Sequence, residues 1–120
     1  MSEWIGRTSP EFVSSVWPFL SDRSRERLEL FGADVARFGR SQNLVSRQDP
    51  VGEIARLVEE SVRGGALLRL DPWSRLLDIG SGAGFPGIVL AALFPERRVV
   101  LAERRRGRRD FLERCAARLG

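Results

Sequence analysis

The sequence predicts an α/β fold in which an N-terminal helical layer precedes the first βαβα units of a Rossmann-like sheet. Apolar residues over positions 1–72 recur at the spacing of amphipathic helices. Over positions 73–120, short apolar runs alternate with helical patterns, and a glycine-rich stretch follows the first of these runs. We therefore expect one structural domain with two parts, a helical region (1–72) and the beginning of a ligand-binding α/β region (73–120).

Three helices are expected in the helical region. They follow an N-terminal arm of eight residues that carries no strong pattern and is expected to be loose, with Trp4 as the residue that could pin it. The first helix covers 10–20, with Ser9 as its cap. The second covers 21–38. After a polar loop, Asp49-Pro50 begins the third, because an acid cap followed by proline is typical of a helix start.

The α/β region has the order strand, helix, strand, helix. The predicted strands cover 76–79 and 98–102, and the predicted helices cover 86–94 and 108–119. This order implies parallel strands joined by right-handed crossovers. Both strands then end at the same edge of the sheet, which is where ligands bind in open parallel sheets.

The composition excludes several classes of site. The chain of 120 residues has no histidine, no tyrosine and a single cysteine, Cys115. A disulfide framework, a His/Cys zinc site, a histidine base and a Ser-His-Asp triad are therefore excluded, and we expect no metal. No apolar run approaches the ~20 residues that cross a bilayer, and no basic-then-apolar signal region begins the chain. We expect a soluble, cytoplasmic protein with no membrane contact.

Arginine carries all the positive charge of the chain, whose net charge is +4. Seven arginines crowd around the second predicted strand and the start of the next helix: Arg97, Arg98, Arg104, Arg105, Arg106, Arg108 and Arg109. The simpler interpretation is a solvated helix start. The functional interpretation is contact with RNA phosphates, and the candidates for it are Arg104, Arg105, Arg106 and Arg108.

The glycine-rich stretch after the first predicted strand is the strongest candidate for a ligand site. Residues 82–87 formally match the G-x-G-x-x-G fingerprint of dinucleotide-binding proteins. The chain also presents an acid two residues before three alternating glycines, Asp78-x-Gly80-x-Gly82-x-Gly84. This pattern suits S-adenosylmethionine, which offers an ammonium group to an acid and a carboxylate to backbone amides. We favour it over a nicotinamide or flavin nucleotide, and both over an empty tight turn, because alternating glycines cost backbone entropy.

A second acid supports a nucleoside-containing ligand. Glu103 ends the second predicted strand about 20 residues beyond the glycines, where an acid accepts hydrogen bonds from both ribose hydroxyls. The expected cofactor-binding residues are therefore Asp78, Gly80, Ser81, Gly82, Gly84, Phe85 and Glu103.

At these residues the sequence resembles the bacterial 16S ribosomal RNA guanine-N7 methyltransferases, once called glucose-inhibited division protein B. The stretch 77–88 reads much like the family's loop, and its Phe-Pro-Gly-Ile end is more specific than its glycines. The family's N-L-T…D-P…V-R-H stretch is matched by Asn43-Leu44, Arg47, Asp49-Pro50 and Arg56. The family's second strand and helix are matched by Leu101, Glu103, Arg108 and Phe111-Leu112. The resemblance spans residues 25–120.

The resemblance implies a class I (Rossmann-like) methyltransferase sheet that binds S-adenosylmethionine, with Gly80 and Phe85 among the contacts and Glu103 on the ribose. It implies methyl transfer to N7 of a guanine in 16S rRNA of the small ribosomal subunit. Since N7 already has a lone pair, catalysis requires positioning rather than a general base, and no catalytic residue is assigned.

The sequence also departs from the family pattern. In the third helix Leu57 stands where the family has a histidine, and Glu60 stands where it has an aspartate. Family members are longer, which implies that this chain is truncated at its C-terminus and is weak or inactive by itself. Two alternatives stay open: a fragment of a dinucleotide-binding oxidoreductase, and a non-enzymatic remnant that binds RNA or a partner.

Overall fold

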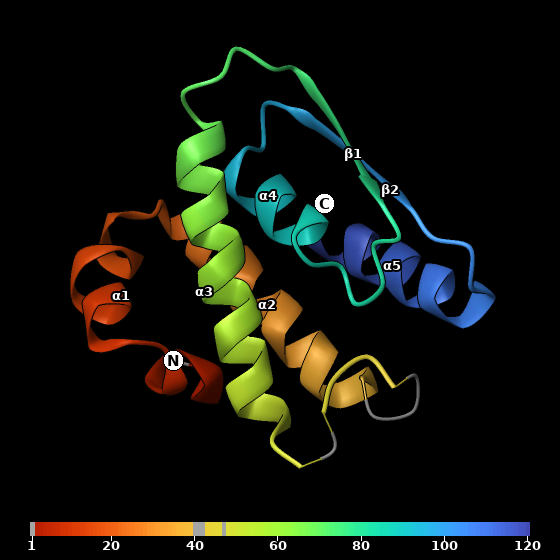
Figure 1. Ribbon diagram of the computed structural model, residues 1–120, viewed down its shortest axis with the longest axis horizontal. Coiled ribbons are helices and arrows are strands. Elements are labelled where there is room, and N and C mark those ends of the chain that lie inside the picture. Colours follow the sequence, from red (N-terminus) through yellow and green to blue (C-terminus); the bar gives the residue numbers. More distant parts are fainter. Residues whose placement is uncertain (1, 40–42, 47) are drawn as a thin grey trace.

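The computed structural model describes residues 2–39, 43–46 and 48–120. Helices pack against one face of a two-stranded parallel sheet (Figure 1). In chain order the elements are η1 (Glu3–Arg7), α1 (Pro10–Ser15), η2 (Trp17–Phe19), α2 (Asp22–Phe38), α3 (Pro50–Leu68), β1 (Arg75–Ile79), α4 (Gly87–Leu93), β2 (Arg98–Ala102) and α5 (Arg106–Leu119). The predicted fold class, a helical layer followed by βαβα, is confirmed.

The two strands pair in parallel with a simple register. Leu76 lies opposite Val99, and Asp78 lies opposite Leu101. These four residues are half-buried, whereas their strand neighbour Leu77 is exposed. Since side chains alternate across a strand, the four half-buried residues face the helices and Leu77 faces away from them.

The N-terminal arm forms a packed turn rather than a loose segment, and Trp4 pins it to the core, as the sequence indicated. Residues of η1 form a 3₁₀ turn in which Trp4 and Ile5 are buried. The Trp4 ring meets Trp17 edge-on at a centroid distance of 5.6 Å. It also lies directly over Gly32, where a Cβ atom would come within 2.2 Å of Trp4 Nε1. A single turn is too short to show a periodic pattern, so only the packing reveals it.

The predicted helix caps are present. Ser9, Ser21 and Asp49 each accept a hydrogen bond from the backbone N–H three residues on. The first helix is shorter than predicted, because α1 ends at Ser15 and a 3₁₀ turn containing Pro18 follows. Proline lacks an N–H and cannot continue an α-helix.

Helix α3 continues through a glycine pair that the sequence suggests should weaken it. A Cβ on Gly65 would lie 2.8 Å from Leu93 Cδ1, so the glycine allows α3 to approach α4 closely. Close packing therefore outweighs the low helix propensity of glycine at this position.

Two boundaries in the α/β region differ slightly from the prediction. Helix α4 begins at Gly87, with Pro86 as its cap rather than in its first turn. Helix α5 begins at Arg106, two residues before the expected start. The first shift lengthens the loop between β1 and α4, and the second shortens the loop between β2 and α5.

One apolar core joins the helical and α/β regions. Phe12, Phe31 and Val58 of the helical region are fully buried together with Val89 of α4. The core thus lies between the helical layer and the covered face of the sheet.

The polar loop between α2 and α3 is described only in part. Arg47, one of the residues that carry the family resemblance, lies outside the described residues, as do residues 40–42. Leu44 and Val45 of the same loop are buried in the core. Among the described helices, none is long and apolar enough to cross a membrane.

Candidate functional site

The loop between β1 and α4 owes its path to three alternating glycines. Gly80, Gly82 and Gly84 have φ values of 72°, 55° and 97°. These values lie in the left-handed region, which side-chain-bearing residues adopt only with strain. The glycine spacing that the sequence shows therefore corresponds to a backbone path that other residues would resist.

Asp78 secures this loop at its base. Its Oδ2 accepts a hydrogen bond from the Gly87 N–H at 3.1 Å, which ties β1 to the first residue of α4. Gly87 itself has no room for a side chain, since a Cβ there would lie 2.6 Å from Asp78 Oδ2. Burial raises the pKa of Asp78 above its ordinary value, and the Gly87 hydrogen bond opposes that rise.

Backbone amides of the loop divide into engaged and open donors. The N–H groups of Gly80 and Ser81 donate to Ala102 O at 2.7 and 3.2 Å. Those of Gly82 and Ala83 have no acceptor within the part of the chain that the structure describes. The loop therefore offers two adjacent donors to an acceptor from outside, such as a carboxylate.

A cavity of about 710 Å³ lies where both strands end. Its lining residues come from the two strand ends and from the start of α5: Ile79, Gly80, Leu101, Ala102, Glu103, Arg104, Arg105, Arg108 and Arg109. The cavity thus brings together Gly80, Glu103 and three of the four arginines that the sequence singles out. Arg109 also lines it, and the sequence shows it only as a member of the arginine run.

Glu103 and Arg108 face each other within this cavity. Their closest side-chain atoms, Glu103 Oε1 and Arg108 Nη1, are 4.0 Å apart. The Glu103 side chain is only 7% exposed. Arg108 also reaches over the loop, because a Cβ on Gly82 would lie 3.8 Å from its Nη1. A long ion pair of this kind holds the carboxylate near the loop and leaves it able to accept other hydrogen bonds.

Other predicted site residues do not line this cavity. They are Asp78, Ser81, Gly82, Gly84, Phe85 and Arg106. Ser81 is buried, and its Oγ donates to Asp78 O at 2.9 Å. Arg106 is exposed at the start of α5. The Ser81 side chain is therefore placed to hold the loop, and the Arg106 side chain to face solvent.

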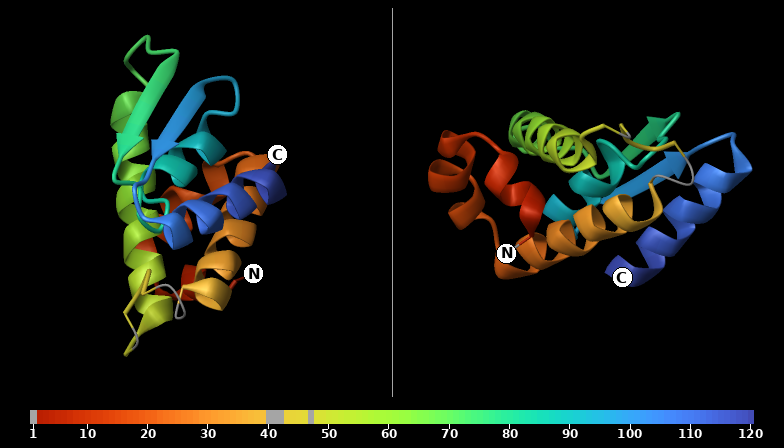
Figure 2. Two further views of the ribbon diagram at one scale, coloured as in Figure 1. Left: turned by 90° about the vertical axis from the view of Figure 1, so that its right-hand side faces the viewer. Right: turned by 90° about the horizontal axis from the view of Figure 1, so that it is seen from below.

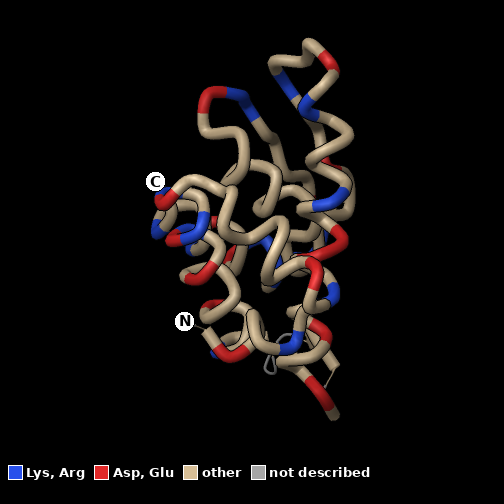
Figure 3. The backbone as a smooth tube through the Cα atoms, turned by 90° about the vertical axis from the view of Figure 1, so that its left-hand side faces the viewer, with Lys and Arg blue, Asp and Glu red and all other residues tan. Residues whose placement is uncertain are grey.

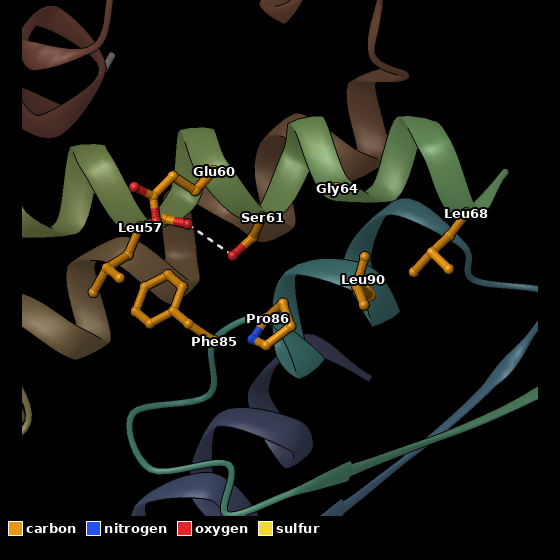
Figure 4. A pocket seen from close by; sticks show the side chains of 8 residues that line it. All are labelled: Leu57, Glu60, Ser61, Gly64, Leu68, Phe85, Pro86 and Leu90. Atoms are coloured by element: carbon orange, nitrogen blue, oxygen red, sulfur yellow. Dashed lines mark hydrogen bonds between the residues drawn. The ribbon is translucent and has the colours of Figure 1, made fainter.

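Phe85 faces a different cavity, on the other side of the loop (Figure 4). This second cavity measures about 360 Å³ and lies between α3 and the start of α4. Phe85 and Pro86 point toward Leu57 and Ser61 of α3 across it, as Figure 4 shows. Phe85 also packs on Phe31, with ring centroids 5.1 Å apart. Leu57 and Glu60, the two positions of the third helix at which the sequence departs from the family pattern, line this cavity together with Phe85. That they share a cavity with Phe85 becomes visible only in the packing of α3 on α4.

The thiol of Cys115 has no part in this chemistry. Cys115 is buried, and burial raises its pKa to about 12, so the thiol stays protonated at neutral pH. Among the described residues, no group of three or more His, Cys, Asp and Glu side chains is arranged to hold a metal ion.

Comparisons with known proteins agree with the resemblance seen in the sequence. A family profile described as rRNA small subunit methyltransferase G (GidB) matches residues 24–120. Ribosomal RNA small subunit methyltransferase G of Halorhodospira halophila is 40% identical over 95 residues, which are 79% of this chain and 44% of that protein. The protein of the same name from Porphyromonas gingivalis is 34% identical, over 78% of this chain and 42% of its own length. The protein of the same name from Borrelia turicatae is 37% identical, over 90% of this chain and 53% of its own length. The chain thus spans about half the length of the curated relatives that it matches.

Proposed function

The chain belongs to the rRNA small subunit methyltransferase G family, and on this premise we propose that it is an S-adenosylmethionine-dependent methyltransferase acting on N7 of a guanine in 16S rRNA. Residues 73–120 would carry the cofactor-binding part, and residues 1–72 would cover it with helices. One observation carries the proposal. Gly80, the first of the three left-handed glycines of the loop, and Glu103 border one cavity at the carboxyl edge of the sheet.

The donors and acceptors at this edge suit the two ends of S-adenosylmethionine. The open N–H groups of Gly82 and Ala83 match its carboxylate. Glu103 can accept hydrogen bonds from its ribose hydroxyls. Asp78 places a negative charge beneath the loop, where the ammonium group is expected. The buried Ser81, and Gly84 and Phe85 beyond it, are proposed to shape the loop around these contacts.

The cofactor, when bound, supplies an electrophilic methyl group. The chain's own residues then need to hold guanine N7 in line with that group, because the N7 lone pair requires no base. Arg104, Arg105 and Arg106 form no ion pair with a carboxylate of the described residues, so their guanidinium groups are free to bind RNA phosphates. Arg108, which faces Glu103, is proposed to contact RNA only beside the bound cofactor.

Calorimetry of the purified chain tests the cofactor assignment. We expect binding of S-adenosylmethionine and no binding of NAD. The variant Glu103→Gln should weaken S-adenosylmethionine binding about tenfold, since it removes a charged acceptor. The control Glu113→Gln makes the same change at an exposed position of α5 and should leave affinity unchanged. Binding of NAD alone would favour the oxidoreductase alternative and refute the proposal.

Methyl transfer tests the activity itself. Small ribosomal subunits are incubated with the chain and labelled S-adenosylmethionine, and N7-methylguanine is located by borohydride and aniline cleavage. Any label is expected at a guanine N7 of 16S rRNA, and its yield is expected to be low, because the chain spans about half the length of its relatives. Cofactor binding without any transfer would instead identify the isolated chain as a binding remnant.

A further inference from the structure

A groove lined by arginines lies at the end of the sheet away from the candidate cofactor cavity. It measures about 410 Å³ and is bordered by α2, α4, the start of β2 and the last turn of α5. Its arginines are Arg23, Arg27, Arg97 and Arg98, and we call it the basic groove. Its floor is apolar, with side chains of α4, β2 and α5.

The positive charge of the basic groove is balanced only at Arg97, whose Nε lies 3.8 Å from Glu96 Oε1. No aspartate or glutamate is among its lining residues. Arg23, Arg27 and Arg98 form no ion pair with any carboxylate in the described ranges. Like charges gathered in one concave surface repel each other and raise the local concentration of anions.

The opposite side of the molecule provides a contrast. There Arg7 pairs with Asp49, and Arg56 pairs with Glu60. Figure 3, which views the α1 and α3 side, shows acidic and basic residues interleaved along the chain. Arg7 and Arg56 are therefore paired with carboxylates, whereas Arg23, Arg27 and Arg98 of the basic groove are not paired with a carboxylate of the described residues.

One arginine of the groove is held in a fixed orientation. The Arg97 guanidinium lies 4.6 Å from the Trp73 ring centroid and 4.8 Å from that of Phe94. Its Nη1 also donates to Asp71 O at 3.3 Å. Stacking of this kind reduces the side-chain entropy lost when a guanidinium binds an anion.

The basic groove and the cofactor cavity lie toward opposite ends of strand β2, and Leu101 borders both. Strand β2 runs from Arg98, at the groove, to Ala102, at the cavity. The four steps from Arg98 to Ala102 extend about 13 Å. Helix α5 runs back along this strand, so that its C-terminal end returns to the groove (Figure 2).

We propose that the basic groove binds a single-stranded segment of RNA, with its phosphates on the arginines and its bases over the apolar floor. Guanidinium groups match phosphate geometry, and an apolar floor accepts the faces of unstacked bases. The proposal rests on the proposed RNA substrate and adds a second contact, distant from the reacting guanine. It would orient the substrate over the cofactor cavity without taking part in methyl transfer.

Salt-dependent RNA binding tests this proposal. The double variant Arg23→Gln/Arg98→Gln removes two exposed charges from the groove. The control Arg7→Gln/Arg56→Gln removes two exposed charges from the balanced side. Affinity for a fluorescein-labelled single-stranded 16S rRNA oligonucleotide is measured against salt. For the groove variant, we expect the log–log slope to fall in magnitude by about 1.4, which corresponds to two lost phosphate contacts. The control should keep the wild-type slope.

The possible outcomes separate the two proposals. An unchanged slope in the groove variant, or an equal fall in the control, overturns the basic-groove proposal. Weaker binding of poly-glutamate without weaker binding of RNA also overturns it, because the groove would then take an acidic protein. S-adenosylmethionine affinity is measured for all variants. If the wild-type chain does not bind S-adenosylmethionine, the proposed function is refuted. A smaller salt dependence of RNA binding in the groove variant would still support the basic-groove proposal.

Discussion

The helical region and the sheet differ in how completely they bury their apolar residues. Phe12 and Phe31 of the helical region are 0% exposed. On the face of the sheet away from the helices, Leu77 is 59% exposed and Ile79 is 78% exposed. Parallel sheets are normally covered on both faces. The helical region and α4 therefore supply the stability of this chain, and the open face of the sheet contributes little to it.

The largest effect is expected in the shared core. Phe31→Ala should lower the free energy of unfolding by about 3–5 kcal/mol, because it removes a buried ring and leaves a cavity. Urea unfolding followed by circular dichroism measures the change. The control Phe19→Ala removes a ring that is 82% exposed and should change stability by less than about 0.5 kcal/mol. Equal losses in both variants would contradict the conclusion that the buried residues of the helical region supply the stability of the chain.

Two glycines provide a sharper test at the junction of the two regions. Gly87→Ala should cost about 1–3 kcal/mol, because its Cβ would lie 2.2 Å from Leu101 Cδ2 and also crowd Asp78. Gly64→Ala meets nothing within 4 Å and lies inside α3, so it should stabilise by about 0.5–1 kcal/mol. Thermal unfolding of the two variants should therefore show shifts of opposite sign. A stabilising Gly87→Ala would show that α4 does not pack tightly on the strand ends.

A pH-dependent effect is expected within the helical region. Burial alone would raise the pKa of Glu59, but hydrogen bonds from Ser9 and Arg63 outweigh it and hold the pKa below 4.5. The ionised carboxylate therefore adds stability above pH 4.5, and this is lost as the pH falls through the lowered folded pKa. Glu59→Gln should cost about 1 kcal/mol at pH 7 and almost nothing once the wild-type carboxyl is protonated. Urea titrations at several pH values measure this, and a pH-independent difference would refute it.

The smallest effect is expected on the open face of the sheet. Leu77→Thr should change the free energy of unfolding by less than about 0.5 kcal/mol, since the side chain already contacts water. The same substitution at the fully buried Leu28 should cost at least about 2 kcal/mol. A large loss for Leu77→Thr would mean that this face is covered in solution.

Local features of the fold could be predicted because they depend on near neighbours in the chain. The caps Ser9, Ser21 and Asp49 act on the backbone three residues away. Strand β2 has the bounds that its apolar run predicts. The docking of Trp4 on Gly32 could not be predicted, because neither residue carries a signal without the other.

The candidate site shows the same division. The sequence places Gly80 and Glu103 at the ends of two parallel strands, and the structure brings them to one cavity. It could not show that Phe85 faces a separate cavity, or that Arg108 reaches Glu103. The basic groove was also hidden, since Arg23 and Arg98 are far apart in the chain.

The sequence by itself determined the order of the α-helices and strands, the capped starts of α1, α2 and α3, and the left-handed loop at Gly80, Gly82 and Gly84. These depend on backbone preferences and on hydrogen bonds within a few residues. Only the tertiary structure decided which arginines form an ion pair with a carboxylate and which face solvent. Ion pairing depends on which side chains from distant elements meet, and that follows from packing rather than from position in the chain.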